Sequence, residues 1–133
     1  MKKHFLLIGF IAMASAVFAQ KSKLTITVKG FENNKGKAFI GIFDTKEKQL
    51  KGLVETIVNQ QVTTSFSDLA SGKYIVKVFH DINENNKLDT GMFGIPKEPW
   101  GVSNNIRPTM SAPKPEDMIV EVKADRSITI NVK

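Results

Sequence analysis

Residues 80–105 carry the side chains of this sequence that are best suited to chemistry. Side-chain oxygens recur at alternate positions and once more four residues later, in Asp81, Asn83, Asn85 and Asp89. Calcium prefers oxygen ligands that a short loop turns inward at alternate positions, together with one backbone carbonyl. Numbered from its first aspartate, this loop takes the carbonyl ligand from Lys87 and puts Asn86 where a left-handed backbone is needed, which Asn tolerates. The spacing predicts a Ca²⁺ loop made by Asp81, Asn83, Asn85, Lys87 and Asp89.

A plain turn is the alternative to a calcium loop. Met92 occupies the twelfth position, where a helix–loop–helix calcium site has a bidentate Glu. The last ligand would have to come from elsewhere in the chain, and Glu98, Asp44 and Asp117 are candidates. Asp and Asn are also ordinary turn residues that bond to their own backbone. With two carboxylates in the loop, the expected calcium affinity is weak, about 10⁻⁴ to 10⁻³ M.

Other side chains near the loop predict a binding surface. Trp100, the only tryptophan, lies between Pro99 and Gly101, where it could stack on a sugar or peptide or close one end of the fold. His80 is the only histidine after residue 19, so no site with two histidine ligands can form there. The predicted ligand-binding residues are His80, Glu98, Trp100, Ser103 and Asn104.

Nucleophilic catalysis finds little support in this sequence. The chain has no cysteine, Ser103 lacks a G-x-S-x-G context, and no phosphate-binding loop is present. We therefore predict a non-catalytic domain with no catalytic residues that binds an envelope or extracellular ligand. Two alternatives stay open. One is a cell-envelope hydrolase of polysaccharide or peptide with Asp81 or Glu98 as general acid or base, and the other is a structural or adhesion component.

The first 19 residues predict export. Lys2 and Lys3 precede an apolar run from Phe5, and small residues follow at Val17 and Ala19, as in a secretory signal peptide. We expect cleavage to leave residues 20–133 as a single periplasmic or secreted domain without a transmembrane segment. Its charge of +4 is scattered along the chain, which argues against nucleic acid as a partner.

Alternating apolar residues predict an all-β fold of about seven short strands. They fall at residues 22–30, 37–44, 73–81, 117–123 and 127–133, with two more within 53–69. Residues 45–52 break the pattern and are expected to form a loop or a short helical turn. Residues 81–116 contain all five prolines and predict one long irregular loop. The expected architecture is an antiparallel Greek-key β-sandwich.

The stretch FHDINENNKLDTGMFGIPKEPWGVSNN closely resembles the signature of a bacterial exported family, domain of unknown function 2141. The segments before it also fit the family, so the resemblance covers most of residues 20–133. Asn86 stands where that family usually has Gly, and Trp100 where a smaller aromatic residue or Gly is frequent. The resemblance implies an exported sandwich-like domain, and DLASGKYIVKVFHD looks like a hairpin of prealbumin-like and adhesin-repeat scaffolds.

Overall fold

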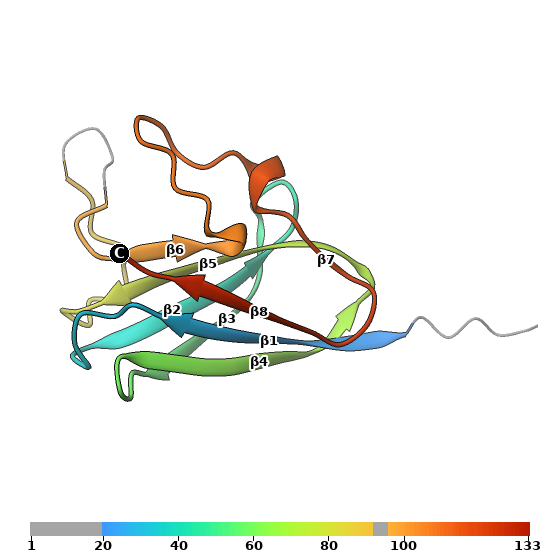
Figure 1. The fold of residues 1–133 in the computed structure, drawn as a ribbon, viewed down its shortest axis with the longest axis horizontal. Helices are drawn as coiled ribbons and strands as arrows, with labels where there is room; N and C mark the ends of the chain where they lie inside the picture. Colours follow the sequence, from blue (N-terminus) through green and yellow to red (C-terminus); the bar gives the residue numbers. More distant parts are fainter. Residues whose placement is uncertain (1–19, 92–95) are drawn as a thin grey trace, which may run out of the picture.

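Two sheets packed face to face form the fold in the computed structural model, which describes residues 20–91 and 96–133 (Figure 1). The predicted signal peptide, residues 1–19, lies outside these ranges. The small sheet has the order β4-β1-β8 and the large sheet the order β3-β2-β5-β6, with β7 paired to the first residues of β5. The strands are β1 (Lys21–Lys29), β2 (Lys37–Phe43), β3 (Gln49–Thr56), β4 (Gln61–Ala70), β5 (Gly72–Asp81), β6 (Trp100–Val102), β7 (Val120–Val122) and β8 (Arg126–Asn131). Two 3₁₀ turns, η2 (Ser103–Asn105) and η3 (Pro115–Met118), complete the described elements.

The predicted all-β sandwich is confirmed, with eight strands in the described ranges where about seven were expected, and several strand boundaries differ. The strand predicted at 117–123 is confirmed only for β7, because its first residues belong to η3. The expected loop over 45–52 is wrong in its second half, because β3 begins at Gln49. The first residues of β3 lie exposed at the edge of the large sheet, so no alternating apolar pattern marks them. The short strand β6, inside the predicted irregular segment, was not expected because three residues after Pro99 are too few to show a period.

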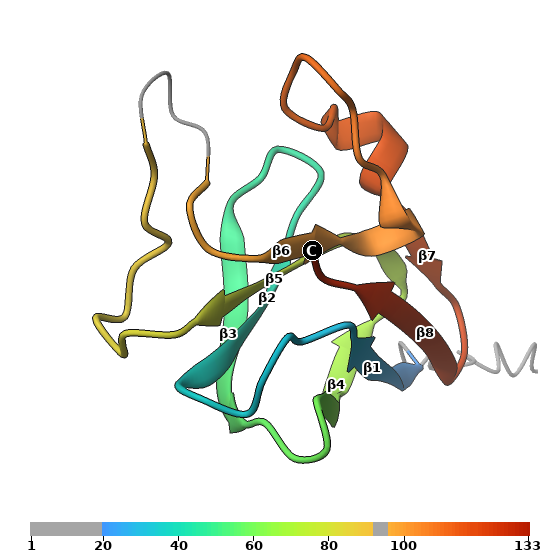
Figure 2. The same cartoon turned by 60° about the vertical axis from the view of Figure 1, so that its left-hand side comes forward.

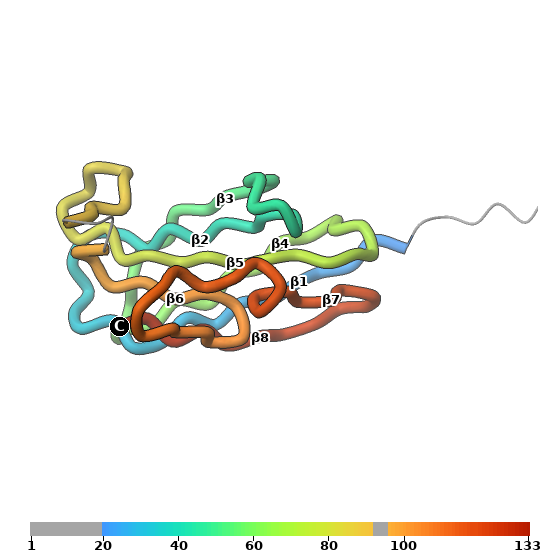
Figure 3. Tube along the Cα trace, turned by 90° about the horizontal axis from the view of Figure 1, so that it is seen from above, coloured from blue at the N-terminus to red at the C-terminus, as the bar shows by residue number. Residues whose placement is uncertain are grey.

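One strand pair departs from the expected antiparallel pattern. β1 and β8 run parallel, with six residue pairs in register from Leu24–Arg126 to Lys29–Asn131. The last two strands lie in different sheets, since β7 pairs with β5 and β8 pairs with β1. Asp125, in the connection between them, accepts a hydrogen bond from the Lys23 backbone N–H through Oδ1 at 2.8 Å. Figures 1 and 3 show β1 and β8 running in the same direction.

The main core lies between the sheets and follows the predicted alternation. Leu24, Ile26 and Val28 of β1 are fully buried, and they face Ile40 and Val78 of the large sheet among others. A second, smaller apolar cluster lies on the outer face of the large sheet, where Ile75, Val102 and Met118 are buried. The segment from η2 to η3 covers this part of the outer face. The large sheet is therefore apolar on both faces.

Backbone hydrogen bonds connect the two sheets at one edge. The N–H of Trp100 donates to the Lys133 carbonyl at 3.0 Å, and the N–H of Lys133 donates to the Trp100 carbonyl at 3.2 Å. A further bond runs from the Val132 N–H to the Lys29 carbonyl at 2.9 Å. The residues after β8 thus tie β6 of the large sheet to the small sheet.

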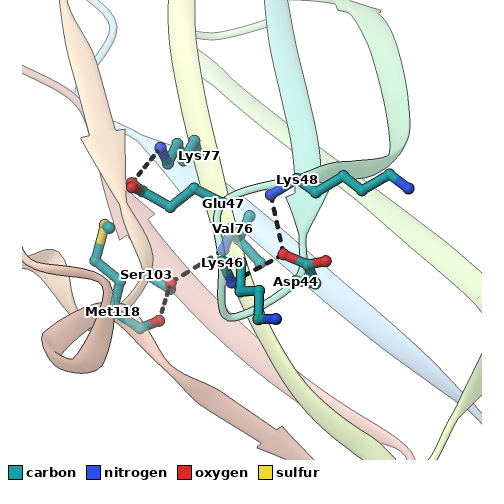
Figure 4. A network of polar contacts seen from close by, with 8 residues as sticks. All are labelled: Asp44, Lys46, Glu47, Lys48, Val76, Lys77, Ser103 and Met118. Carbon is teal, nitrogen blue, oxygen red and sulfur yellow. Dashed lines mark hydrogen bonds and ion pairs between the residues drawn. The ribbon is translucent and has the colours of Figure 1, made fainter.

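A buried hydroxyl holds the covering segment on β5. Ser103 Oγ accepts a hydrogen bond from the Val76 N–H at 3.1 Å and donates to the Met118 carbonyl, as Figure 4 shows. Because Ser103 is fully buried, both bonds form away from water. This contact fixes the position of η3 above the outer face of the large sheet.

Candidate functional site

An aromatic row crosses the outer face of the large sheet. Phe39 of β2 pairs with Phe79 of β5, and Phe79 pairs in turn with Trp100 of β6. The rings of Phe39 and Phe79 are stacked, with centroids 4.9 Å apart and planes within 9°. All three side chains are half-buried. The row therefore presents a partly exposed apolar floor on the side of the sheet that faces away from the main core.

Loops raised on both sides of this floor turn it into a groove of about 790 Å³. Leu88 and Pro96 line it from the segment after β5, and Pro108–Pro113 line it from the segment after η2. Glu47, in the turn between β2 and β3, lies at the border. Figure 2 shows all three segments rising on the same side of the large sheet. We call this feature the aromatic groove.

Two charged side chains meet in the aromatic groove. Lys77 Nζ lies 2.8 Å from Glu47 Oε1, a contact that Figure 4 shows. The same Nζ lies 5.0 Å from the centroid of the Phe43 ring. Asp44 shapes the turn that carries Glu47, because its Oδ1 accepts the N–H groups of Lys46 and Lys48, each at 2.9 Å. Glu47 itself has a φ of 63°, in the left-handed region. A turn with a strained residue thus presents the carboxylate to Lys77.

The predicted calcium loop has its polar side chains gathered around Asp89. Asn83 Nδ2 donates to Asp89 Oδ2 and Asn85 Nδ2 donates to Asp89 Oδ1, each at 2.6 Å. Asp81 accepts the N–H groups of Asn85 and Asn86 at 3.2 and 2.8 Å. The side chains named as ligands therefore come close together.

The backbone conformation of the 81–89 loop agrees with the sequence prediction at Asn86. Asn86 has a φ of 62°, as expected for the residue that replaces Gly in the turn. Lys87, whose carbonyl was the expected fifth ligand, is exposed and donates its N–H to Asn85 Oδ1 at 3.0 Å. Within residues 20–91 and 96–133, no three His, Cys, Asp or Glu side chains are placed to hold a metal ion together. The loop instead offers two carboxylates and two amides.

Hydrogen bonds to the Asp89 carboxylate lower its pKa below the ordinary value of 3.8. The Asn85 amide is the largest cause, followed by the Asn83 amide, and Lys97 adds a favourable positive charge. Donors aimed at a carboxylate stabilise its charged form. Asp89 therefore carries a negative charge at neutral pH, which suits a carboxylate ligand of a cation.

Glu98 lies behind the loop and braces both of its ends. Its side chain is buried, with Oε2 accepting the Ile82 N–H at 2.8 Å and Oε1 accepting the Asp89 N–H at 3.0 Å. The other two candidates for a final calcium ligand lie in separate elements, Asp44 in the β2–β3 turn and Asp117 in η3. Glu98 is therefore the candidate in direct contact with the loop.

His80 is held inside the fold, at the end of β5. Its Nε2 lies 2.5 Å from the Lys35 carbonyl, and its ring meets the Phe31 ring edge-on at 5.2 Å. Nδ1 is buried without a hydrogen-bond partner in the described structure. These contacts connect β5 to the β1–β2 loop and leave His80 fully buried.

Of the five predicted ligand-binding residues, Trp100 lines the aromatic groove and the other four do not. His80, Glu98 and Ser103 are buried, and Asn104 donates through Nδ2 to the carbonyls of Asp117 and Ile119 at 3.0 and 2.9 Å. The Trp100 ring also has the Arg107 guanidinium 4.1 Å above it. Of the predicted binding surface, Trp100 therefore lines the groove, and the other four residues hold neighbouring segments of the fold in place.

Sequence reasoning did not identify Phe39, Phe43, Lys77 and Phe79 as site residues. One signal was available, because the strand at 37–44 is apolar on both faces. A strand in a two-layer sandwich buries one face between the sheets, so a second apolar face requires a cover or a ligand. Phe39 and Phe43 occupy this second face.

Comparison with models of protein families gives a match over most of the chain. A family model described as an uncharacterized protein conserved in bacteria matches residues 26–131, which include the whole 80–105 stretch. No curated protein and no solved structure matches the chain significantly. In the described ranges, no helix has the length and apolar character needed to cross a membrane. The resemblance predicted from the motif is confirmed, and the chain belongs to the bacterial family DUF2141.

Proposed function

We propose that this protein is a non-catalytic binding domain that holds an apolar ligand in the aromatic groove. The observation that carries the proposal is the volume of about 790 Å³ over the half-buried row of Phe39, Phe79 and Trp100. Small-molecule sites are usually concave, mostly apolar and about 300–1,000 Å³ in volume. Export, which the N-terminal segment predicts, would place this groove in the cell envelope or outside the cell.

The two carboxylates that the hydrolase alternative requires are already engaged in shaping a loop. Both oxygens of Asp81 and both oxygens of Glu98 accept backbone N–H bonds that shape the 81–89 loop. A general acid or base must instead reach the substrate proton that it transfers. Neither Asp81 nor Glu98 lines the aromatic groove. Their contacts are those of residues that build a loop.

Binding of the neutral fluorescent probe N-phenyl-1-naphthylamine tests the proposal. Because Trp100 is the only tryptophan and lies in the groove, its emission should change as the probe binds. Phe79→Ser removes the central ring of the floor and should weaken binding roughly tenfold, the loss expected for one buried aromatic contact. Fluorescence titration measures both effects.

Val58→Ser is the matched control, since Val58, in the connection between β3 and β4, is 61% exposed and lies outside the groove. It should leave the affinity unchanged, and circular dichroism would verify that both variants are folded. Equal affinities of the two variants, or no response of Trp100 to the probe, would contradict the proposal.

A second candidate activity is calcium binding by the 81–89 loop, which would order one wall of the groove. The proximity of the Asn83 and Asn85 side chains to the Asp89 carboxylate favours it, as does the left-handed backbone of Asn86. Calcium would have to displace the two amide NH₂ groups from Asp89 and turn the amide oxygens toward the ion, away from the backbone N–H groups that they now accept. Asp81, Asn83 and Asn85, the Lys87 carbonyl and Asp89 would provide the oxygen ligands.

Calorimetric titration of calcium into chelator-treated protein tests this candidate. The wild type should bind with a Kd of about 10⁻⁴ to 10⁻³ M, and calcium at ten times Kd should add about 1.4 kcal/mol to the free energy of unfolding. Asp89→Asn should abolish the heat of binding, because it removes one of the two loop carboxylates. Asp68→Asn, at an exposed aspartate of β4, should not. Absence of binding at millimolar calcium would leave the loop as a hydrogen-bonded turn.

A further inference from the structure

We infer that the ligand of the aromatic groove is an anionic amphiphile, whose acidic head group pairs with Lys77 in place of Glu47. Its hydrocarbon part would lie on the aromatic row. This inference rests on the proposed binding function and specifies the chemical class of the ligand. Its support is the way in which Lys77 and Glu47 are held and the apolar character of the residues around them.

Lys77 is the fixed charge of the groove. It lies in the middle of β5, between Gly41 of β2 and Val102 of β6 in the sheet register. A Cβ at Gly41 would lie 2.7 Å from Cε2 of Phe43, so the Phe43 ring occupies the space that a side chain at position 41 would fill. From there the ring lies 5.0 Å from the Lys77 ammonium. Strand, glycine and ring together hold the positive charge over the groove.

Glu47 is the replaceable charge of the pair. It belongs to the short turn between β2 and β3, whereas Lys77 lies within a strand that is paired on both sides. The side chains of Lys77 and Glu47 are 35% and 39% exposed, so water competes for both ends of the ion pair. An acidic head group can therefore take the place of the Glu47 carboxylate, which then turns toward solvent.

The remaining groove surface matches a hydrocarbon chain better than a sugar. Lys77 and Glu47 are the charged side chains that line it, and most of the other lining residues are apolar, among them Leu88, Trp100 and Met110. A sugar could stack its C–H face on the aromatic row, but its hydroxyl groups would find few partners. Besides Lys77 and Glu47, the polar side chains of the lining are Gln49, Thr109 and Ser111. A ligand with one acidic end and an apolar body would pair its charge with Lys77 and pack its apolar part against the aromatic row.

Displacement of N-phenyl-1-naphthylamine by decanoate, 1-decanol and decylammonium, below their aggregation concentrations, tests the inference. Decanoate should bind the wild type roughly tenfold more tightly than decanol, and decylammonium should bind least. Lys77→Met should remove the preference for decanoate and leave decanol binding unchanged. Glu47→Gln should strengthen decanoate binding, because it removes the competing carboxylate. Lys73→Met is the matched control, since it removes the same charge from an exposed position of β5 outside the groove.

The outcomes separate this inference from the binding function itself. Equal affinities for decanoate and decanol, a preference for decylammonium, or a loss of decanoate binding in Lys73→Met equal to that in Lys77→Met would each overturn the anionic head group. Probe binding that none of the three compounds displaces would overturn the amphiphile and leave the groove as a binding site. Failure of the probe itself to bind would remove the proposed function as well.

Discussion

Replacing Gly36 by alanine is expected to lower the free energy of unfolding by about 3 kcal/mol or more. Gly36 has a φ of +67°, and a Cβ there would lie 2.0 Å from the Asp81 carbonyl oxygen and 2.8 Å from Ile82 Cα. These are backbone atoms at the end of β5, so the clash cannot be relieved by turning a side chain. Urea denaturation followed by far-UV circular dichroism measures the change.

Gly72→Ala is the matched control for this prediction. Its Cβ would meet nothing closer than 3.8 Å, and the nearest atoms belong to the Tyr74 side chain. We expect a change within about 1 kcal/mol for this variant. A loss in Gly36→Ala as small as that in Gly72→Ala would show that the β1–β2 loop does not approach β5 as closely as described.

Glu98→Ala is expected to cost about 2–4 kcal/mol, because it leaves two N–H groups without their charged acceptor. These are the backbone N–H groups of Ile82 and Asp89, at the two ends of the 81–89 loop. The effect should be concentrated in that loop. Thermal denaturation measures the overall loss, and hydrogen exchange at the Ile82 and Asp89 amides measures the local one.

Hydrogen exchange at these two amides also distinguishes the loss of the Glu98 hydrogen bonds from the loss of a negative charge in general. Glu98→Gln keeps an oxygen for one of the two N–H groups and should lie between the wild type and Glu98→Ala. Glu32→Ala removes an exposed glutamate from the β1–β2 loop and should leave both amides as protected as before. Unchanged exchange in Glu98→Ala would contradict the bracing role.

Much of the fold could be predicted because several strands alternate apolar core residues with polar surface residues. Leu24, Ile26 and Val28 alternate with polar residues and are all fully buried. Edge residues defeat this reasoning, and the start of β3 at Gln49 is exposed and carries no pattern. The parallel pairing of β1 with β8 was also not foreseen. Strand partners far apart in sequence are chosen by the packing of the whole sandwich, which no single segment reveals.

The two candidate sites differ in how much of them the sequence contains. The 81–89 loop is local, so the spacing of Asp81, Asn85 and Asp89 predicts that their side chains come close, as they do. The aromatic groove is not local. Phe39 and Trp100 become part of one floor only because each pairs with Phe79 in the register of the large sheet. The alternation of apolar residues within one strand does not show which strands pair or in which register.

The parallel pairing of β1 with β8 also determines how the domain would respond to a pulling force. β1 leads away from one end of the molecule and β8 leads toward the other, with six residue pairs in register between them (Figures 1 and 3). Tension applied at the start of β1 and at the end of β8 would load the hydrogen bonds of this pair in shear, all at once, rather than peel them apart singly. The rate of forced unfolding, which depends on the barrier rather than on equilibrium stability, should therefore be low along this axis.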